Sequence, residues 1–199
     1  VNVHHFADML VDYLKAHDNF GMKIAISRED VLLDTGGGLK KAAPFFIDDL
    51  RGVDEPFVLH NVDVLTTIDL GRMVASHREN RALATLAVQD RATSRYLLFD
   101  QSRELCGRQA GTDGPPELIR PTQMFDAFAF SGIHVISTRI FKMLSEKGVF
   151  SIITSYLRMA AQAEKIQCFR TDEYYWRDLG KVDGLLQAAE DLKQNLELQ

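Results

Sequence analysis

The stretch Pro56-Phe57-Val58-Leu59-His60-Asn61-Val62-Asp63 predicts a β-strand that ends at a carboxylate. Its apolar run lies between a proline and polar residues, which is typical of a strand buried on both faces of a sheet. Asp63 would then lie just beyond the carboxyl end of that strand. Ligands of open α/β sheets bind beyond such strand ends, because variable loops and helix amino termini meet there. The stretch therefore indicates both a fold class and the edge of the sheet at which a site should lie.

Strand-like and helix-like segments alternate along the rest of the chain. Apolar runs predict further strands at 1–3, 23–27, 82–88, 96–99, 104–106, 128–136, 166–170 and 175–178. Helical spacing predicts helices at 6–16, 39–46, 69–78, 138–147 and 152–163, and a closing helix with an apolar stripe of Val182, Leu185, Leu186, Ala189, Leu192 and Leu196. Residues 109–123 hold three of the five prolines and predict an irregular loop. This alternation predicts an α/β fold with a mainly parallel, Rossmann-like sheet flanked by helices.

Length and composition fit one globular domain that spans residues 1–199. The chain is 46% apolar and 26% charged, with no run near the roughly 20 apolar residues that cross a bilayer. It begins without the basic and apolar sections of a signal peptide, so we expect a cytoplasmic protein with no membrane segment. A net charge of −5 argues against nucleic-acid binding. Cys106 and Cys168 fit no metal spacing and are expected to be buried thiols.

Two carboxylates follow predicted strands, Asp63 after one and Asp178 after another. If the fold brought them into one crevice, they would suit Mg²⁺, which takes one or two carboxylates and completes its shell with phosphate oxygens and water. An aspartate at a strand end is also a common turn former or helix cap, so the pattern alone leaves both interpretations open.

Two glycine positions have a similar double interpretation. The run Gly36-Gly37-Gly38 predicts a tight turn before a helix, and such a turn could also lie against a base or a phosphate. Gly132, inside an apolar strand, indicates either a close approach for a sugar or a bulge in the sheet. The run matches neither the dinucleotide fingerprint nor the P-loop, which disfavours dehydrogenases and kinases. The histidines show no zinc-binding spacing.

Three arginines are candidates for contact with a ligand phosphate. Arg91, Arg95 and Arg108 lie in the middle of the chain, where a planar guanidinium could pair with phosphate oxygens. A solvated surface position is the alternative for each of them.

Four segments, in this order and spacing, resemble sugar-1-phosphate nucleotidyltransferases. They are Asp34-Thr35-Gly36-Gly37-Gly38-Leu39-Lys40-Lys41-Ala42, Pro56 to Val64, Phe130-Ser131-Gly132-Ile133-His134-Val135-Ile136 and Trp176-Arg177-Asp178-Leu179-Gly180. The similarity covers nearly the whole chain. It is closest to compact bacterial members described as mannose-1-phosphate guanylyltransferase-like proteins or N-acetylmuramate-1-phosphate uridylyltransferases.

The resemblance implies roles for the matching residues. It implies that a catalytic Mg²⁺ is held by Asp63 and Asp178, that the sugar lies near Gly132, and that the nucleotide lies against Thr35, Gly36, Gly37, Gly38 and Asn61. The implied reaction joins a nucleoside triphosphate to a sugar 1-phosphate, giving a nucleoside-diphosphate sugar and pyrophosphate. Positioning and electrostatics would supply most of the catalysis. A homodimer is compatible with this family.

The chain departs from the family at three places. Val62 stands where the family usually has glycine, and Lys181 stands where threonine is common. The family's first strand, its glycine-rich loop and a lysine that grips the triphosphate would precede Val1. We therefore expect a domain truncated at its amino terminus, with weak or no turnover if these 199 residues are the whole molecule.

Two other functions compete with this one. A module of the same fold could bind a nucleotide or sugar phosphate without catalysis, although such a module need not keep both Asp63 and Asp178. A glycosyltransferase with a nucleotide-sugar donor could share the fold, but its DxD motif has two carboxylates where Asn61-Val62-Asp63 offers one.

Overall fold

A computed structural model describes residues 1–47 and 54–194. The chain forms two compact units. The first unit comprises 1–55 and 138–156, and the second comprises 56–137 and 157–199. Each unit contains part of the predicted site.

The first unit holds a short parallel strand pair and several helical segments. Strand β1 (Asn2–Val3) pairs with β2 (Ser27–Arg28), so the strand predicted at 23–27 is shorter and later than expected. The helical segments are α1 (Ala7–Ala16), η1 (Asp18–Gly21), α2 (Asp34–Lys41), α3 (Pro44–Ile47) and η2 (Thr138–Lys142). The helix predicted at 6–16 is thereby confirmed.

The glycine run lies inside helix α2, so the prediction of a turn before a helix is wrong. All three glycines are buried. A β-carbon at Gly36 would clash with the ring of Phe150, and one at Gly37 would lie 2.5 Å from the carbonyl oxygen of Gly148. The Gly36 N–H donates to the Phe150 carbonyl over 3.0 Å. The glycines therefore let a helix pack directly against backbone.

The helix predicted at 138–147 is also reduced to the short segment η2. Lys40 explains part of this, because its Nζ donates to the carbonyls of Leu144 and Glu146 at 2.6 Å each. A lysine that binds these carbonyls favours an open backbone over a continued helix.

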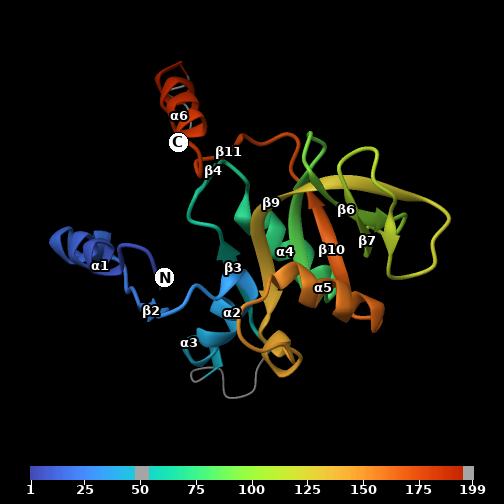
Figure 1. Ribbon diagram of the computed structural model, residues 1–199, viewed down its shortest axis with the longest axis horizontal. Coiled ribbons are helices and arrows are strands. Elements are labelled where there is room, and N and C mark those ends of the chain that lie inside the picture. Colours follow the sequence, from blue (N-terminus) through green and yellow to red (C-terminus); the bar gives the residue numbers. More distant parts are fainter. Residues whose placement is uncertain (48–53, 195–199) are drawn as a thin grey trace. The chain divides into compact units, whose positions relative to one another are not determined.

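The second unit is built on a seven-stranded sheet in the order β10-β5-β9-β6-β7-β8, with β3 also paired to β9. Its strands are β3 (Pro56–His60), β5 (Ala84–Gln89), β6 (Arg95–Asp100), β7 (Leu105–Ala110), β8 (Glu117–Leu118), β9 (Phe125–Ser137) and β10 (Ile166–Arg170). The long strand β9 runs through the middle of this sheet in Figure 1. Each of these strands except the two-residue β8 was predicted to within a few residues.

The expectation of a mainly parallel sheet is wrong for this unit. Only β5 and β10 pair in parallel, and the other described pairs are antiparallel. Strand β9 causes the difference, because it inserts between β3 and β5 and runs opposite to both. The connection from β3 through a helix to β5 still joins strands of one direction. The carboxyl ends of β3, β5 and β10 therefore share one edge of a mixed α/β sheet.

The core lies between this sheet and α4 (Leu70–Asn80), which contacts β3, β5 and β9. Met73 of α4 is fully buried in a cluster with Ile68, Ala87, Ile133 and Val135. Asp69 caps the start of α4, because its carboxylate accepts from the Arg72 N–H at 2.9 Å. Strand β5 is buried throughout, but β3 is not, contrary to the expectation of burial on both faces. Among the described strands β3 pairs with β9 alone, so its other edge has no strand partner within that part of the chain.

The remaining elements are α5 (Ile152–Ala161), the strands β4 (Val64–Thr66) and β11 (Trp176–Asp178), and α6 (Val182–Gln194). The closing helix is confirmed, but its predicted stripe is largely exposed, with Val182 at 72% and Leu186 at 60%. Leu196 lies outside the described residues. In α6, Asp191 instead accepts from Arg177 and Tyr175 at 2.7 Å each.

Both cysteines are buried free thiols, as expected. Burial raises the pKa of Cys106 and of Cys168 to about 11. Among the helices of residues 1–47 and 54–194, none is long and apolar enough to span a membrane.

Candidate active site

The strands β4 and β11 bring Asp63 and Asp178 together. The two strands are antiparallel, with Val64 opposite Asp178 and Thr66 opposite Trp176. The Leu179 N–H donates to the Asp63 carbonyl over 2.7 Å, which extends the pairing past the end of β11. Residues far apart in the chain thus become neighbours at the sheet edge that the sequence had indicated.

The two carboxylates face the same small volume beside Gly180. A β-carbon at Gly180 would lie 3.0 Å from Asp178 Oδ1 and 3.1 Å from Asp63 Oδ2. The Gly180 N–H also donates to Asp178 Oδ1 over 2.8 Å, which fixes that carboxylate. Both side chains remain exposed to solvent. The absence of a side chain at Gly180 therefore keeps open the space between two carboxylate oxygens.

This donor set fits a hard divalent cation. Carboxylate oxygens are the ligands that Mg²⁺ prefers, and two suffice when phosphate oxygens and water complete the shell. In the part of the chain that the structure describes, no group of three or more His, Cys, Asp or Glu side chains could hold a metal. A cation at Gly180 would thus depend on a ligand for its remaining bonds.

Gly132 packs beside this pair and adopts a backbone conformation that favours glycine, with φ 77°. A β-carbon there would lie 3.0 Å from Asn61 Nδ2 and 3.1 Å from Val64 Cγ2. The Asn61 N–H donates to the Gly132 carbonyl at 2.9 Å. The pairing of β5 with β9 shifts register between Leu86 and Val88, opposite this glycine, as the bulge interpretation predicts.

Trp176 and Arg91 complete the cluster. From the sequence, Arg91 is one of three arginines that could either contact a ligand phosphate or lie on the solvated surface. The Trp176 indole donates to the Ser131 carbonyl over 2.8 Å. The Arg91 guanidinium stacks on the indole ring, 3.8 Å from its centre, and donates to the Phe130 carbonyl over 2.8 Å. Arg91 follows the carboxyl end of β5, which runs in the same direction as β3. The strand-end rule that indicates Asp63 therefore also applies to Arg91.

Arg108 differs from Arg91 because it forms an exposed ion pair with Glu117 at 2.7 Å. That position is a solvated surface, the alternative that the sequence had allowed. Arg95 is exposed at the start of β6, which is also the solvated surface position that the sequence allows.

Thr35 and the glycine run lie in the first unit. Thr35 is exposed near the start of α2, and its Oγ1 accepts from the Ile152 N–H over 3.1 Å. The three glycines behind it are buried against residues 148–150 and Glu29. Close packing alone accounts for the glycines.

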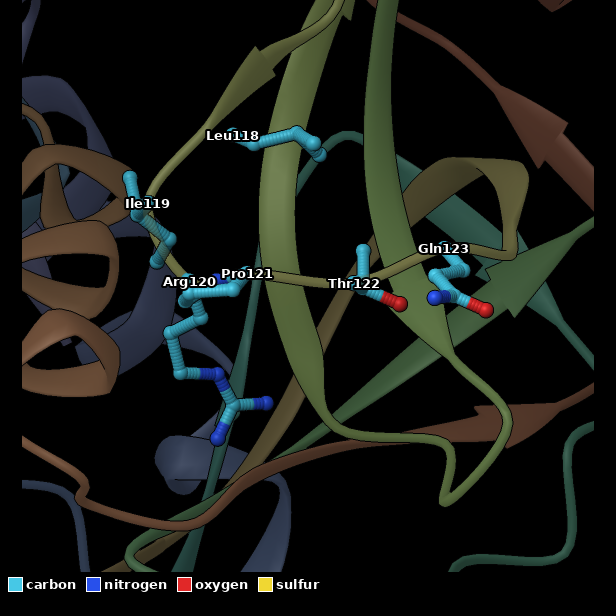
Figure 2. A pocket seen from close by; sticks show the side chains of 6 residues that line it. All are labelled: Leu118, Ile119, Arg120, Pro121, Thr122 and Gln123. Atoms are coloured by element: carbon cyan, nitrogen blue, oxygen red, sulfur yellow. The ribbon is translucent and has the colours of Figure 1, made fainter.

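A cavity of about 610 Å³ lies away from these residues, along the irregular loop after β8. Its six lining residues are consecutive, Leu118 to Gln123, and Figure 2 shows their side chains spread along one segment. Arg120 is its only charged lining residue, and it is already paired with Asp100 at 3.1 Å and Glu104 at 3.0 Å. The cavity therefore offers no free charge to a ligand.

Comparison with known proteins places this geometry in context. The family model described as nucleotidyl transferase matches residues 1–195. A UTP–glucose-1-phosphate uridylyltransferase of Synechocystis sp. is 36% identical over 98 residues, covering 43% of this chain and 24% of that protein. The match thus spans about a quarter of the length of this curated relative.

Solved structures share the fold. The crystal structure of HddC from Yersinia pseudotuberculosis has a TM-score of 0.71 and 17% identity, covering 96% of this chain and 76% of that one. A UDP-glucose pyrophosphorylase complexed with UDP-glucose has a TM-score of 0.70 and 18% identity, with 96% and 79% covered. At such identities the likeness establishes the mixed α/β fold, a central sheet flanked by helices.

Proposed function

Because the chain belongs to the nucleotidyl transferase family, we propose that it forms a nucleoside-diphosphate sugar and pyrophosphate from a nucleoside triphosphate and a sugar 1-phosphate. The observation that carries the proposal is the convergence of Asp63 and Asp178 on Gly180. A family member that had lost its chemistry would have no need to keep two exposed carboxylates at one point. The proposal covers residues 1–199 as one domain, since the family model runs across both units.

In the proposed reaction, a phosphate oxygen of the sugar 1-phosphate attacks the α-phosphorus of the nucleotide. The bond from that phosphorus to the oxygen bridging to the β-phosphate breaks, and pyrophosphate leaves with the electron pair. Asp63 and Asp178 would hold Mg²⁺, which neutralises negative charge on the phosphate oxygens when bound. Gly180 leaves room between the carboxylates, and its N–H keeps Asp178 oriented.

The remaining residues would position the substrates. Asn61 and Gly132, which contact each other, would lie beside the nucleotide and the sugar respectively. Val62 is 91% exposed next to Asp63, so its side chain is free to face a nucleotide. In the first unit, Thr35 is proposed to contact the nucleotide, because it is exposed near the start of α2. Gly36 to Gly38 lie buried behind it and would support its position through the packing of that helix. A cytoplasmic location suits the two unpaired cysteines.

A substrate screen tests this function. The full-length protein is incubated with Mg²⁺, the common nucleoside triphosphates and a panel of sugar 1-phosphates that includes glucose and mannose 1-phosphate. We expect one pair to yield a nucleoside-diphosphate sugar by mass spectrometry, with an equal amount of pyrophosphate. Release of free nucleoside diphosphate would instead indicate a glycosyltransferase, and release of neither product would favour a binding module.

A further inference from the structure

The Arg91 guanidinium is a fixed cation that the metal-binding role of the two carboxylates does not account for. Stacking on Trp176 and the hydrogen bond to the Phe130 carbonyl hold it in place. Trp176 is itself held by its bond to the Ser131 carbonyl. This anchoring orders a long side chain at an entropic cost, which suits a group that must be in position before a ligand arrives.

The charge of Arg91 has no carboxylate partner within the described residues. Its Nη2 donates to a neutral carbonyl, that of Phe130, and its buried Nε has no acceptor in the same part of the chain. Burial lowers the pKa of Arg91, and the negative charge of Asp178 acts in the opposite direction. The carboxylate is thus within electrostatic reach without forming an ion pair. An arginine stays charged under such a shift, because its ordinary pKa is so high.

The surroundings indicate which ligand this cation would meet. Trp176 and Asp178 are two residues apart in β11, so their side chains lie on the same face of that strand. Arg91 stacks on Trp176 and therefore lies on the face that carries Asp178. Two carboxylates at one point repel a phosphate group, and a cation fixed on the same face offsets that repulsion. A planar guanidinium is suited to phosphate oxygens.

We propose that Arg91 binds the phosphate group of the sugar 1-phosphate, with Trp176 as the residue that positions its guanidinium. This inference rests on the proposed function for its substrate class, a phosphate monoester. It differs from that function in its test, because binding can be measured without turnover.

The protein carries its own reporter for the experiment. Trp176 is the single tryptophan of the chain and touches the Arg91 guanidinium, so selectively excited tryptophan fluorescence reports on the surroundings of this one residue, the Arg91 contact included. The full-length protein is titrated with glucose 1-phosphate and mannose 1-phosphate, and separately with glucose and mannose, in the absence of nucleotide. Calorimetry of the same titrations gives affinities that do not depend on the fluorescence of each variant.

Saturable binding is expected for at least one sugar 1-phosphate and not for its parent sugar. Arg91→Gln should weaken that binding at least tenfold, which corresponds to the loss of about one charge-assisted hydrogen bond. The affinity of Arg91→Lys should fall between those of the unaltered protein and Arg91→Gln, because lysine keeps the charge and loses the planar stack. Arg108→Gln removes an equal charge from an exposed ion pair and should leave the affinity unchanged.

Two results would overturn the proposal. One is the absence of phosphate-dependent binding to either sugar 1-phosphate. The other is an Arg91→Gln protein with lower thermal stability but unchanged affinity, since that describes a purely structural stack. Phosphate binding through Arg91 without any pyrophosphate release would instead remove the proposed function and leave this inference standing. Pyrophosphate release with unchanged affinity in Arg91→Gln would support the proposed function and overturn this inference.

Discussion

Replacing Asp63 or Asp178 by asparagine should lower Mg²⁺-dependent turnover of the full-length protein by about a thousandfold or more. Both side chains converge at Gly180, and each supplies a negative oxygen that an amide cannot replace as a cation ligand. The two substitutions should not be additive, since losing either ligand disables the same centre. Steady-state pyrophosphate release across a range of Mg²⁺ concentrations measures the effect.

The fold should survive these substitutions. Both carboxylates are exposed, and asparagine has nearly the same shape, so thermal midpoints should stay close to that of the unaltered protein. Glu117→Gln is the matched control, because it removes an exposed carboxylate from a surface ion pair on β8. Full turnover in either aspartate variant, at unchanged Mg²⁺ dependence, would show that the pair does not hold the metal.

Gly37→Ala should destabilise the protein by about 2 kcal/mol. Two effects oppose each other at this position. Alanine is favoured over glycine inside a helix by about 1 kcal/mol. Its β-carbon, however, would lie 2.5 Å from the Gly148 carbonyl oxygen and 2.9 Å from Leu33 Cβ. The backbone carbonyl cannot move aside as a flexible side chain could, so the clash should outweigh the gain in helix propensity.

Thermal or denaturant unfolding checks the sign of that difference. Lys41→Ala, at an exposed position of the same helix, should change stability by less than about 0.5 kcal/mol. A Gly37→Ala protein that is more stable than the unaltered one would mean that α2 does not pack on residues 148–150. The glycine run would then need another explanation, with contact to a nucleotide the first to examine.

The strands and the two carboxylates could be predicted from sequence because their patterns are local. Apolar runs mark β5, β9 and β10, and Asp63 follows the run 56–60 after two further residues. Their pairing was harder to predict, because it depends on partners far along the chain. Nothing in Ala84 to Gln89 reveals that the neighbour of β5 is β9, some forty residues later and antiparallel. Because the sequence does not reveal this antiparallel pairing, the alternation of strands and helices favoured a parallel sheet.

Arg91 and the glycine run show the same difference between what local sequence predicts and what only tertiary contacts determine. Arg91 has no local motif, and its stack on Trp176 exists only once β5, β9 and β11 are assembled. Three consecutive glycines are usually a turn, because glycine disfavours helix by about 1 kcal/mol. Here the packing of α2 against Phe150 and Gly148 requires them within the helix. Tertiary contact thus overrides local preference at both places.

The central claim is that Asp63 and Asp178 hold the divalent cation of a nucleotidyl transfer site. Crystals of the full-length protein grown with Mn²⁺ and the nucleoside-diphosphate sugar from the screen test it most directly, through anomalous scattering at the manganese edge. The account predicts a peak about 2 Å from an oxygen of each aspartate and in contact with the diphosphate. A bound diphosphate whose metal lies elsewhere, with both carboxylates free, would contradict it.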